Sequence, residues 1–189
     1  MGKPAISTRR RILDAAYEQF YRKGFTRVSV DEVAAAAKVT KRTLYYHFKS
    51  KDDLLASVLD LHHEMALARV RKHESRYAGD ADHFIDTLFS ELTKWSAKPG
   101  WAGAGFTRLA MELADLPGHP ARAVARRHKS VVEDWYAELF AKQRIASPKE
   151  RARELALLTE GATALILIHG DRSYADTAAK AARRLVRKK

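Results

Sequence analysis

The segment 41–47 gathers side chains that are suited to binding a nucleic acid. On a helix, where successive residues are about 100° apart, Leu44 and Phe48 share one face, and the other residues of the segment point away from it. Those outward residues are Lys41, Arg42, Thr43, Tyr45, Tyr46 and His47. Their polar groups can donate hydrogen bonds to phosphates and guanine edges, and tyrosine rings can touch thymine methyl groups. We expect Leu44 and Phe48 to anchor this helix in a core that includes Phe20 and Val33.

The excess positive charge of the chain is concentrated in its first quarter. Residues 1–51 hold 12 Lys and Arg against 4 Asp and Glu, whereas the remaining 138 residues hold 23 against 19. Two thirds of the net charge of +12 therefore lies in this first segment. A concentrated basic surface attracts a polyanion, and counterion release favours nucleic acid as that partner. Charge alone leaves open the alternative of a solvated basic face with no partner.

Several classes of protein are excluded or disfavoured by residues that the sequence lacks. The 189 residues include no cysteine, which excludes disulfides, cysteine-ligated metals and thiol chemistry. No apolar run approaches about 18 residues and the first residues are charged, so we expect no membrane span, no secretory signal and a cytoplasmic location. His62 and His63 are adjacent rather than one helical turn apart, and HExxH, GxSxG and P-loop motifs are absent. We therefore expect no catalytic residue, no metal and no cofactor.

The periodicity of apolar residues predicts an all-α fold of about nine helices. Ser7 or Thr8, Thr40 and Ser50 can cap helices, and Ser29 forms a capping box with Glu32. Two helices are predicted to begin near residues 8 and 30, and the others to cover about 41–48, 51–76, 81–97, 106–115, 121–142, 149–169 and 173–188. The first three have the size of a helix-turn-helix unit, in which the second helix of the motif enters the major groove.

This first part of the chain resembles a known family. Gly24-Phe25 is followed by Ser29-Val30-Asp31-Glu32-Val33-Ala34 and then by VTKRTLYYHFKSKDDL over 39–54. These runs strongly resemble the N-terminal domain of TetR-family transcriptional regulators, and TLYYHFKSK is the most specific of them. The likeness is close over residues 7–54, whereas the remaining 135 residues match only in length and helical layout.

The resemblance implies that the helix from Lys41 reads the major groove. Base contacts are implied for Lys41, Arg42 and Tyr45, backbone contacts for Thr43, Tyr46, His47 and Lys51, and phosphate contacts at the helix N-termini of Ser29 and Thr40. Two residues depart from the family. Lys38 stands where glycine is common, in a turn suited to a positive φ, at a cost of about 1 kcal/mol. Arg42 stands where a small residue is common, and its bidentate fit to guanine predicts G·C pairs in the half-site.

The last two helices are expected to join two copies of the chain. Residues 162–168 are apolar almost all round, so both sides of this helix must be covered, one of them by a second copy. The resemblance implies a homodimer through a four-helix interface, over about residues 149–188. On the last helix we expect a close-packed stripe of Ala178, Ala181, Ala182 and Leu185.

The helices between residues 51 and 142 carry large apolar side chains with a few polar groups among them, as small-molecule pockets do. Candidate ligand-binding residues are His62, Met65, Leu88, Trp95, Phe106, Leu109, Glu112, His128 and Trp135. The alternative interpretation is that these stripes are ordinary core. We expect residues 1–50 to form the helix-turn-helix DNA-binding domain and residues 51–189 the ligand-binding and dimerisation domain.

Taken together, the residues and the resemblance predict a ligand-responsive regulator of transcription. As a dimer it would bind a palindromic operator in double-stranded DNA as a repressor, and a small-molecule effector would release it. A helical architectural DNA-binding protein without a ligand and a small helical enzyme are the alternatives, and selection of a palindrome from random DNA would exclude both. The effector, the operator, the regulated genes and the role of residues 1–6 are not predicted, and activation is left open beside repression.

Overall fold

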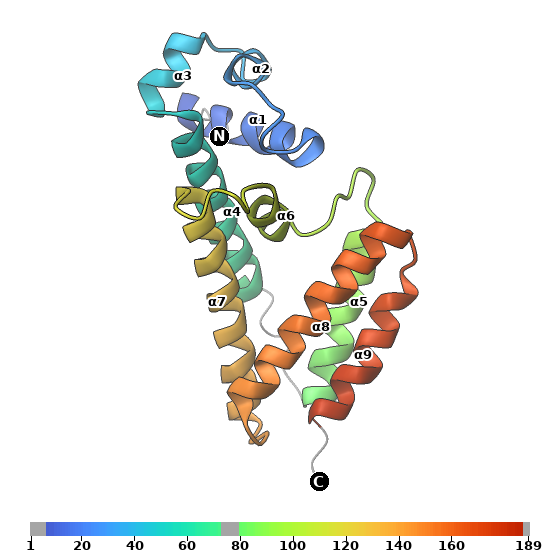
Figure 1. The fold of residues 1–189 in the computed structure, drawn as a ribbon. Helices are drawn as coiled ribbons and strands as arrows, with labels where there is room; N and C mark the ends of the chain where they lie inside the picture. The colour runs from blue at the N-terminus through green and yellow to red at the C-terminus, as the bar shows by residue number, and fades with distance from the viewer. Residues whose placement is uncertain (1–6, 73–79, 187–189) are drawn as a thin grey trace, which may run out of the picture. The chain divides into compact units, whose positions relative to one another are not determined.

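The computed structural model describes residues 7–72 and 80–186, and within them every regular element is an α-helix (Figure 1). The nine helices of this described part are α1 (Thr8–Lys23), α2 (Val30–Ala36), α3 (Lys41–His47), α4 (Lys51–Lys72), α5 (Ala81–Ser96), α6 (Gly105–Glu112), α7 (Pro120–Lys142), α8 (Pro148–His169) and α9 (Ser173–Val186). The all-α fold class is confirmed. No helix in the described ranges combines the length and the hydrophobicity that crossing a membrane requires.

Side-chain caps begin the helices where the sequence predicts them. The hydroxyl groups accept hydrogen bonds from backbone N–H groups three residues further on: Ser7 from Arg10 at 3.3 Å, Thr40 from Thr43 at 3.0 Å and Ser50 from Asp53 at 3.0 Å. The predicted helix ends agree less well. Helix α6 stops at Glu112 because residues 113–115 form a turn, and the predicted extensions over 73–76 and 187–188 lie outside the described residues.

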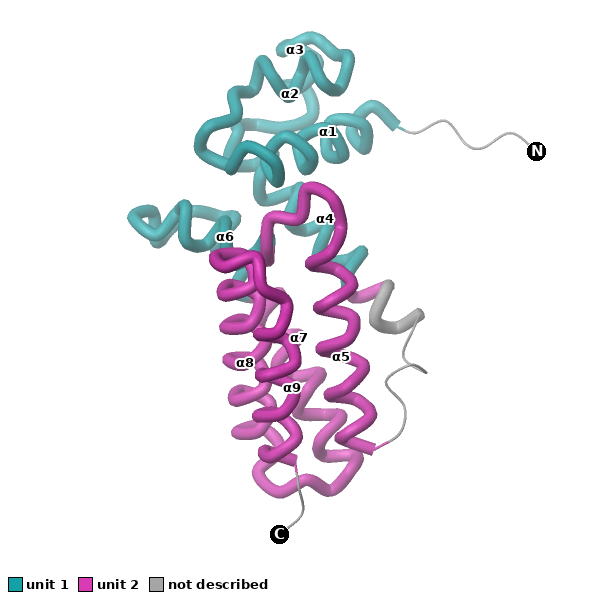
Figure 2. The backbone as a smooth tube through the Cα atoms, turned by 90° about the vertical axis from the view of Figure 1, so that its right-hand side faces the viewer, with its two compact units in different colours: residues 1–66, 105–126 teal, residues 67–104, 127–189 magenta. Residues whose placement is uncertain are grey.

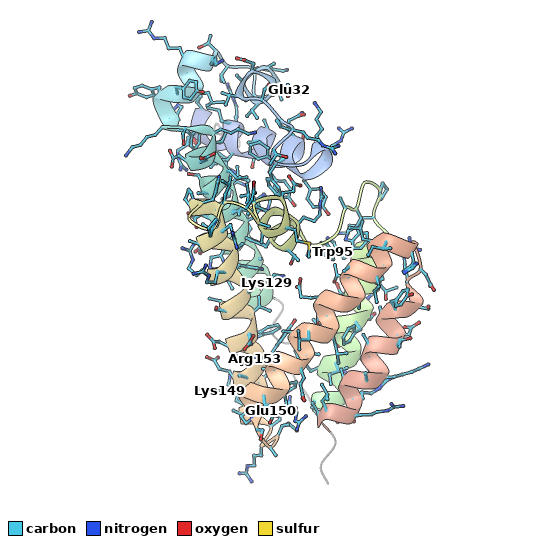
Figure 3. The ribbon with its side chains drawn as sticks, in the orientation of Figure 1. Glu32, Trp95, Lys129, Lys149, Glu150 and Arg153 are labelled. Carbon is cyan, nitrogen blue, oxygen red and sulfur yellow. The ribbon has the colours of Figure 1, made fainter. Side chains whose placement is uncertain are left out.

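Helix α2 begins with the predicted capping box, whose Glu32 is labelled in Figure 3. The Ser29 hydroxyl accepts from the N–H of Glu32 at 3.2 Å, and the Glu32 carboxylate accepts from the N–H of Ser29 at 2.8 Å. The other carboxylate oxygen lies 2.8 Å from the ammonium group of Lys23. The bond from Lys23 first, and those from Ser29 next, lower the pKa of Glu32 from 4.5 to about 2. The fold thus stabilises the charged form of this carboxylate.

The described residues form two compact units (Figure 2). The first contains those up to residue 66 together with 105–126, and the second contains the rest, so that α4 and α7 contribute to both. The first unit therefore extends past residue 50, because Leu54, Leu109 and Val124 are buried in the same core as α1–α3. The division into domains at residue 50 stays a prediction about the DNA-binding module.

The core of the first unit holds α3 in place. Leu44 and Phe48 are 0% and 1% exposed and lie in one cluster with Phe20 and Val33, as the sequence predicts. The guanidinium group of Arg9 covers Phe48 at 5.1 Å from its ring centroid, close enough for a cation–π contact. A seven-residue helix is too short to be stable by itself, so this burial determines where α3 lies.

Two turns of the first unit require a left-handed backbone. Lys38 has φ 55° between α2 and α3, which confirms the positive φ predicted for this residue. Gly24 has φ 95° after α1, and a Cβ there would meet a carboxylate oxygen of Glu112 at 3.2 Å. Side chains other than glycine adopt such φ values at a cost. The turn after α1 therefore needs glycine for two reasons, its φ and its closeness to Glu112.

The second unit is a bundle of α5, α8 and α9 with the later part of α7 (Figure 1). Phe84 of α5 makes edge contacts with Trp135, Tyr136 and Phe140 of α7, with ring centroids 5.7, 5.8 and 6.0 Å away. Ion pairs Lys129–Glu160 and Arg153–Glu133 join α7 to α8. Aromatic packing thus holds α5 against α7, and charge pairing holds α8 against α7.

The stripe predicted on α9 faces the interior of its own chain. Ala178 and Ala182 are 7% and 0% exposed, and Leu185 packs against the same cluster, because α5 and α8 both lie against α9. The expectation that these residues meet a second copy is therefore wrong for the buried alanines. Helical spacing identified an apolar face correctly but assigned it to the wrong neighbour.

We expect Leu44→Ala to lower the free energy of unfolding by about 2–5 kcal/mol, because it leaves a cavity in a fully buried site. Equilibrium unfolding in urea measures this effect. The control is Tyr46→Ala in the same helix, whose side chain is 85% exposed and whose loss should change stability by no more than about 0.5 kcal/mol. Equal effects of the two substitutions would contradict the anchoring role of Leu44.

We expect the stabilising effect of the Glu32 charge to depend on pH. Because folding lowers the pKa of Glu32 to about 2, its contribution is fully present above pH 4.5 and is lost as the pH falls from 4.5 toward 2. Urea unfolding at pH 7 and pH 3 should therefore show Glu32→Gln less stable than the wild type at pH 7, with a smaller difference at pH 3. Glu18→Gln, at an exposed site on α1, is the control and should show no such change. A difference for Glu32→Gln that is the same at both pH values would contradict this assignment.

Candidate nucleic-acid interface

Helix α3 exposes a continuous basic and aromatic face opposite its buried anchors. Lys41, Arg42, Tyr45 and Tyr46 are all exposed, the two tyrosines by 45% and 85%. Within the described residues, the guanidinium group of Arg42 makes no hydrogen bond or ion pair. Its five donors are therefore available to an external acceptor. Two exposed tyrosines and two cations on one short helix form a surface that can meet both phosphates and bases.

The start of α3 is held by two polar contacts. The hydroxyl oxygens of Thr40 and Thr43 lie 2.8 Å apart, so each already has a partner within the protein. The ammonium group of Lys41 donates to the Asp31 carboxylate of α2 at 3.0 Å. The bond to Asp31 raises the pKa of Lys41 above its usual value of 10.5, so this side chain stays charged at neutral pH. Lys41, for which a base contact is predicted, is thus already paired with Asp31.

Lys51 and His47 lie at the edge of this face. The Lys51 ammonium group donates to the carbonyl of Thr26 at 3.2 Å, which leaves two of its three donors for other acceptors. The His47 ring is half-buried and meets the edge of Tyr46 with ring centroids 5.2 Å apart. Both residues are held at the border of the exposed face. Their predicted backbone contacts to DNA stay predictions.

The N-terminus of α2 is occupied by the protein itself. The N–H of Ser29, one of the predicted phosphate donors, is already bonded to Glu32 at 2.8 Å. A phosphate could take this N–H only by displacing a carboxylate whose charge is stabilised there. The prediction at Ser29 is untested, and the capping box is an obstacle to it.

The candidate ligand-binding residues of the first unit have partners inside that unit. The His62 ring stacks on Tyr17 with centroids 3.4 Å apart, and the Met65 sulfur lies 3.7 Å from an Arg10 nitrogen. Leu109 is fully buried in the core, and Phe106 packs against the same core. These contacts are those of ordinary core and surface residues. No ligand is present to test the prediction.

Glu112 has a structural role in the first unit that the sequence did not suggest. Its carboxylate accepts from the N–H of Phe25 at 2.7 Å and of Thr26 at 3.2 Å. One turn earlier in α6, Arg108 donates to the carbonyl of Tyr21 at 3.1 Å. Helix α6 is thus tied to the end of α1 and to the turn that leads to α2.

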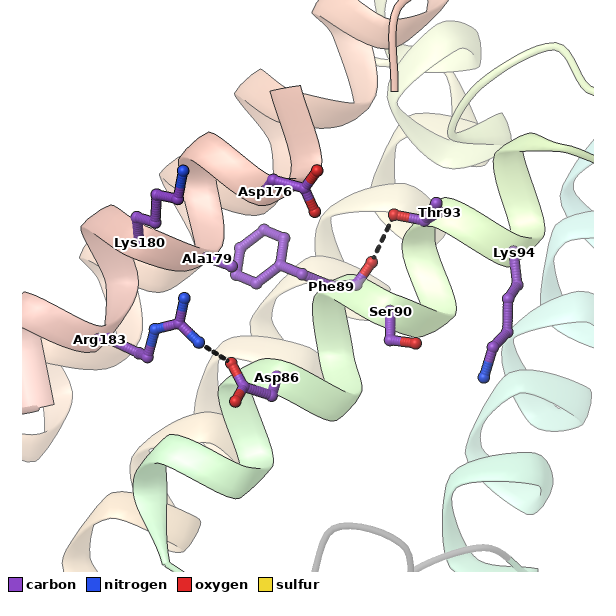
Figure 4. Close-up of a pocket in the computed structure, with 9 residues that line it drawn as sticks. All are labelled: Asp86, Phe89, Ser90, Thr93, Lys94, Asp176, Ala179, Lys180 and Arg183. Carbon is purple, nitrogen blue, oxygen red and sulfur yellow. Dashed lines mark hydrogen bonds and ion pairs between the residues drawn. The ribbon is translucent and has the colours of Figure 1, made fainter. Parts of the chain in front are cut away.

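The remaining candidate ligand-binding residues are Leu88, Trp95, His128 and Trp135, and all four lie in the second unit. Leu88, Trp95 and Trp135 are half-buried against its core. A groove of about 560 Å³ lies between α5 and α9 (Figure 4), and none of the candidates lines it. Its rim is charged and includes the ion pair Arg183–Asp86. The groove gives the ligand prediction no support.

One exposed apolar surface stands out in the second unit, on α8. Ala162, Thr163 and Ile166 are buried, whereas Leu157, Leu165 and Ile168 are 69%, 37% and 71% exposed. The exposed Gly161 and Ala164 lie on the same side of the helix, since positions 157, 161, 164, 165 and 168 share one face. We call these five residues the α8 face. It agrees with the sequence-based expectation that one side of this helix is left for another protein surface.

Two residues near the candidate interface were missed by sequence reasoning. Asp31 pairs with Lys41 across the turn between α2 and α3, and Arg9 covers the Phe48 anchor. Neither relation follows a helical spacing, because each joins two different helices. The one signal in the sequence was an acidic residue, Asp31, in the otherwise basic part of the chain ten residues before Lys41.

Comparison with known proteins agrees with this arrangement. The model for bacterial regulatory proteins of the tetR family matches residues 12–58. The HTH-type transcriptional regulator TtgR of Pseudomonas putida is 37% identical over 92 residues, which are 47% of this chain and 44% of TtgR. The A-factor receptor protein of Streptomyces griseus is 41% identical over 56 residues, 30% of this chain and 20% of that protein. The matched segments thus cover less than half of either relative.

The likeness to solved structures extends over nearly the whole chain. A TetR-family transcriptional regulator from Streptomyces coelicolor is 28% identical with a TM-score of 0.82, over 95% of this chain and 94% of that one. Both the matched segment around α3 and the all-helical remainder therefore have counterparts in one group of proteins. Over residues 12–58 the chain thus carries the N-terminal motif of the tetR family of bacterial regulatory proteins, and its fold is similar to that of a TetR-family transcriptional regulator.

Proposed function

We propose that this chain is a transcriptional regulator that binds double-stranded DNA through the exposed face of α3. The observation that carries the proposal is the opposition of two faces on one short helix. Leu44 and Phe48 are buried, and Lys41, Arg42 and Tyr45 are exposed. A helix held in this way can enter a major groove and bring cations and aromatic rings to base edges.

Arg42 is the residue that we expect to give most of the sequence preference. It is exposed and makes no bond within the described residues, and its planar group matches the two acceptors of guanine. Thr43, Tyr46, His47 and Lys51 are proposed to contact the DNA backbone. Such contacts set orientation and affinity without reading sequence.

We propose further that two copies associate through the α8 face. Leu157, Leu165 and Ile168 form an exposed apolar stripe, and Gly161 and Ala164 between them allow a second helix to approach closely. A two-fold axis pairs one surface with itself, so a single apolar face suffices for a dimer. Two α3 helices would then read half-sites about 34–36 Å apart or a multiple of that distance.

The response to a small molecule is the third part of the proposal. One relative is named as a receptor, for A-factor, which supports a ligand-binding role for this chain as well. Leu88, Trp95, His128 and Trp135 are the candidates that lie in the second compact unit. An effector would act by binding one conformation better than the other, and so release the operator and end repression.

We expect selection from random-sequence duplexes to return a palindrome with a guanine in each half-site. Arg42→Ala should then weaken binding to the selected duplex by about 1–3 kcal/mol and relax the preference at that guanine, as measured by fluorescence anisotropy. Arg126→Ala removes another exposed arginine of the first unit and is the matched control. Selection of no common sequence, or an equal loss for both variants, would contradict the proposed reading face.

We expect Ile168→Glu to weaken self-association by about 3 kcal/mol, roughly a hundredfold in Kd, because it places an unpaired charge in an apolar interface. Analytical ultracentrifugation measures the dimer fraction. Leu116→Glu alters another exposed leucine, 49% accessible and outside α8, and should leave association unchanged. If Ile168→Glu and Leu116→Glu leave the same dimer fraction, the α8 face is excluded as the interface.

A further inference from the structure

Asp31 and Lys41 connect the two helices of the helix-turn-helix through an exposed ion pair. Asp31 is in the first turn of α2, and Lys41 is the first residue of α3. The Lys41 nitrogen is 3.0 Å from an Asp31 oxygen, although the two side chains are 54% and 67% exposed. A carboxylate therefore lies on the basic face that is proposed to meet a polyanion, where a negative charge by itself opposes binding.

The position of Asp31 distinguishes it from the other acidic residue of this turn. Glu32 is engaged by Lys23 and by the backbone of Ser29, so it serves the start of α2. Asp31 has Lys41 as its bonding partner within the described residues and makes no contact that caps a helix. The side-chain bond of Asp31 is therefore made to a residue of α3.

An ion pair of this kind restricts one of the most flexible side chains. Lysine has four rotatable bonds, and fixing such a side chain upon binding costs affinity. One donor of the ammonium group is used by Asp31, which leaves two for acceptors on a base edge. A lysine that is already held in place before binding loses less freedom when it meets that edge.

We propose that Asp31 is a positioning residue that holds the Lys41 ammonium group for contact with one base pair of the operator. This inference rests on the proposed DNA-binding function. While it is held by Asp31, Lys41 is restrained from reaching phosphates of unrelated DNA, which a free lysine would contact without regard to sequence. Asp31 therefore increases selectivity in two ways. It favours the contact of Lys41 with the operator base pair, and it disfavours contacts of Lys41 with phosphates of unrelated DNA.

Asp31→Asn tests this in the full-length chain, with the duplex selected by the wild type and an unrelated duplex of equal length. The ratio of the two affinities should fall about two- to tenfold, the range expected for ordering one long side chain. For the unrelated duplex, the plot of log affinity against log salt should steepen by about 0.9, the value for one added phosphate contact. When each base pair of the selected site is changed in turn, Asp31→Asn should discriminate less than the wild type at one base pair and equally at the others.

Three further variants separate positioning from a general effect of charge or fold. Asp134→Asn makes the same change of charge at an exposed site in the second unit and should leave the ratio unchanged. In a Lys41→Met background, Asp31→Asn should no longer alter the ratio or the salt slope. Asp31→Glu keeps the carboxylate and should restore part of the selectivity. Urea unfolding of every variant shows whether the fold is intact.

The outcomes distinguish this inference from the proposal on which it depends. A wild type that selects no sequence overturns both. A wild type that selects a site, with an Asp31→Asn variant that keeps the same ratio and slope, overturns the positioning role alone. The ion pair also has a readout without DNA, since the pKa of the Lys41 ammonium group, followed by NMR, should fall in Asp31→Asn. An unchanged value would show that the pair does not form in solution.

Discussion

The burial of Leu44 and Phe48 is the constraint on which the rest of the candidate interface depends. A helix of seven residues has too few internal hydrogen bonds to be stable in water, so α3 exists as a helix because its apolar side is packed. That packing also decides which residues face outward. The exposed positions of Arg42, Tyr45 and Tyr46 follow from the buried positions of their neighbours.

Carboxylates organise much of the basic first unit. Glu32 caps α2 and pairs with Lys23, Asp31 pairs with Lys41, and Glu112 binds two N–H groups after α1. Each carboxylate joins segments that are separate in the sequence. Glu112 spans the longest interval, 87 residues to Phe25, so the position of α6 is linked directly to the helices around α3.

The elements could be predicted from local sequence signals more fully than their partners could. Caps at Ser7, Ser29, Thr40 and Ser50, the strained turn at Lys38 and the anchors of α3 all follow from rules that span a few residues. The stripe on α9 could not be assigned to its neighbours in this way, because helical periodicity identifies an apolar face without saying what covers it. Glu112 was judged by the apolar residues beside it, whereas its partners, the N–H groups of Phe25 and Thr26, lie in the turn after α1.

Amide hydrogen exchange of the full chain, with and without a duplex that the protein itself selects, tests the reading role of α3 most directly. Bound DNA should slow exchange in peptides that cover residues 40–51, with the strongest effect over α3, while peptides of α8 keep their rates. Slowed exchange in the second unit, with residues 40–51 unchanged, would mean that DNA binds elsewhere and that the exposed face of α3 does not read it.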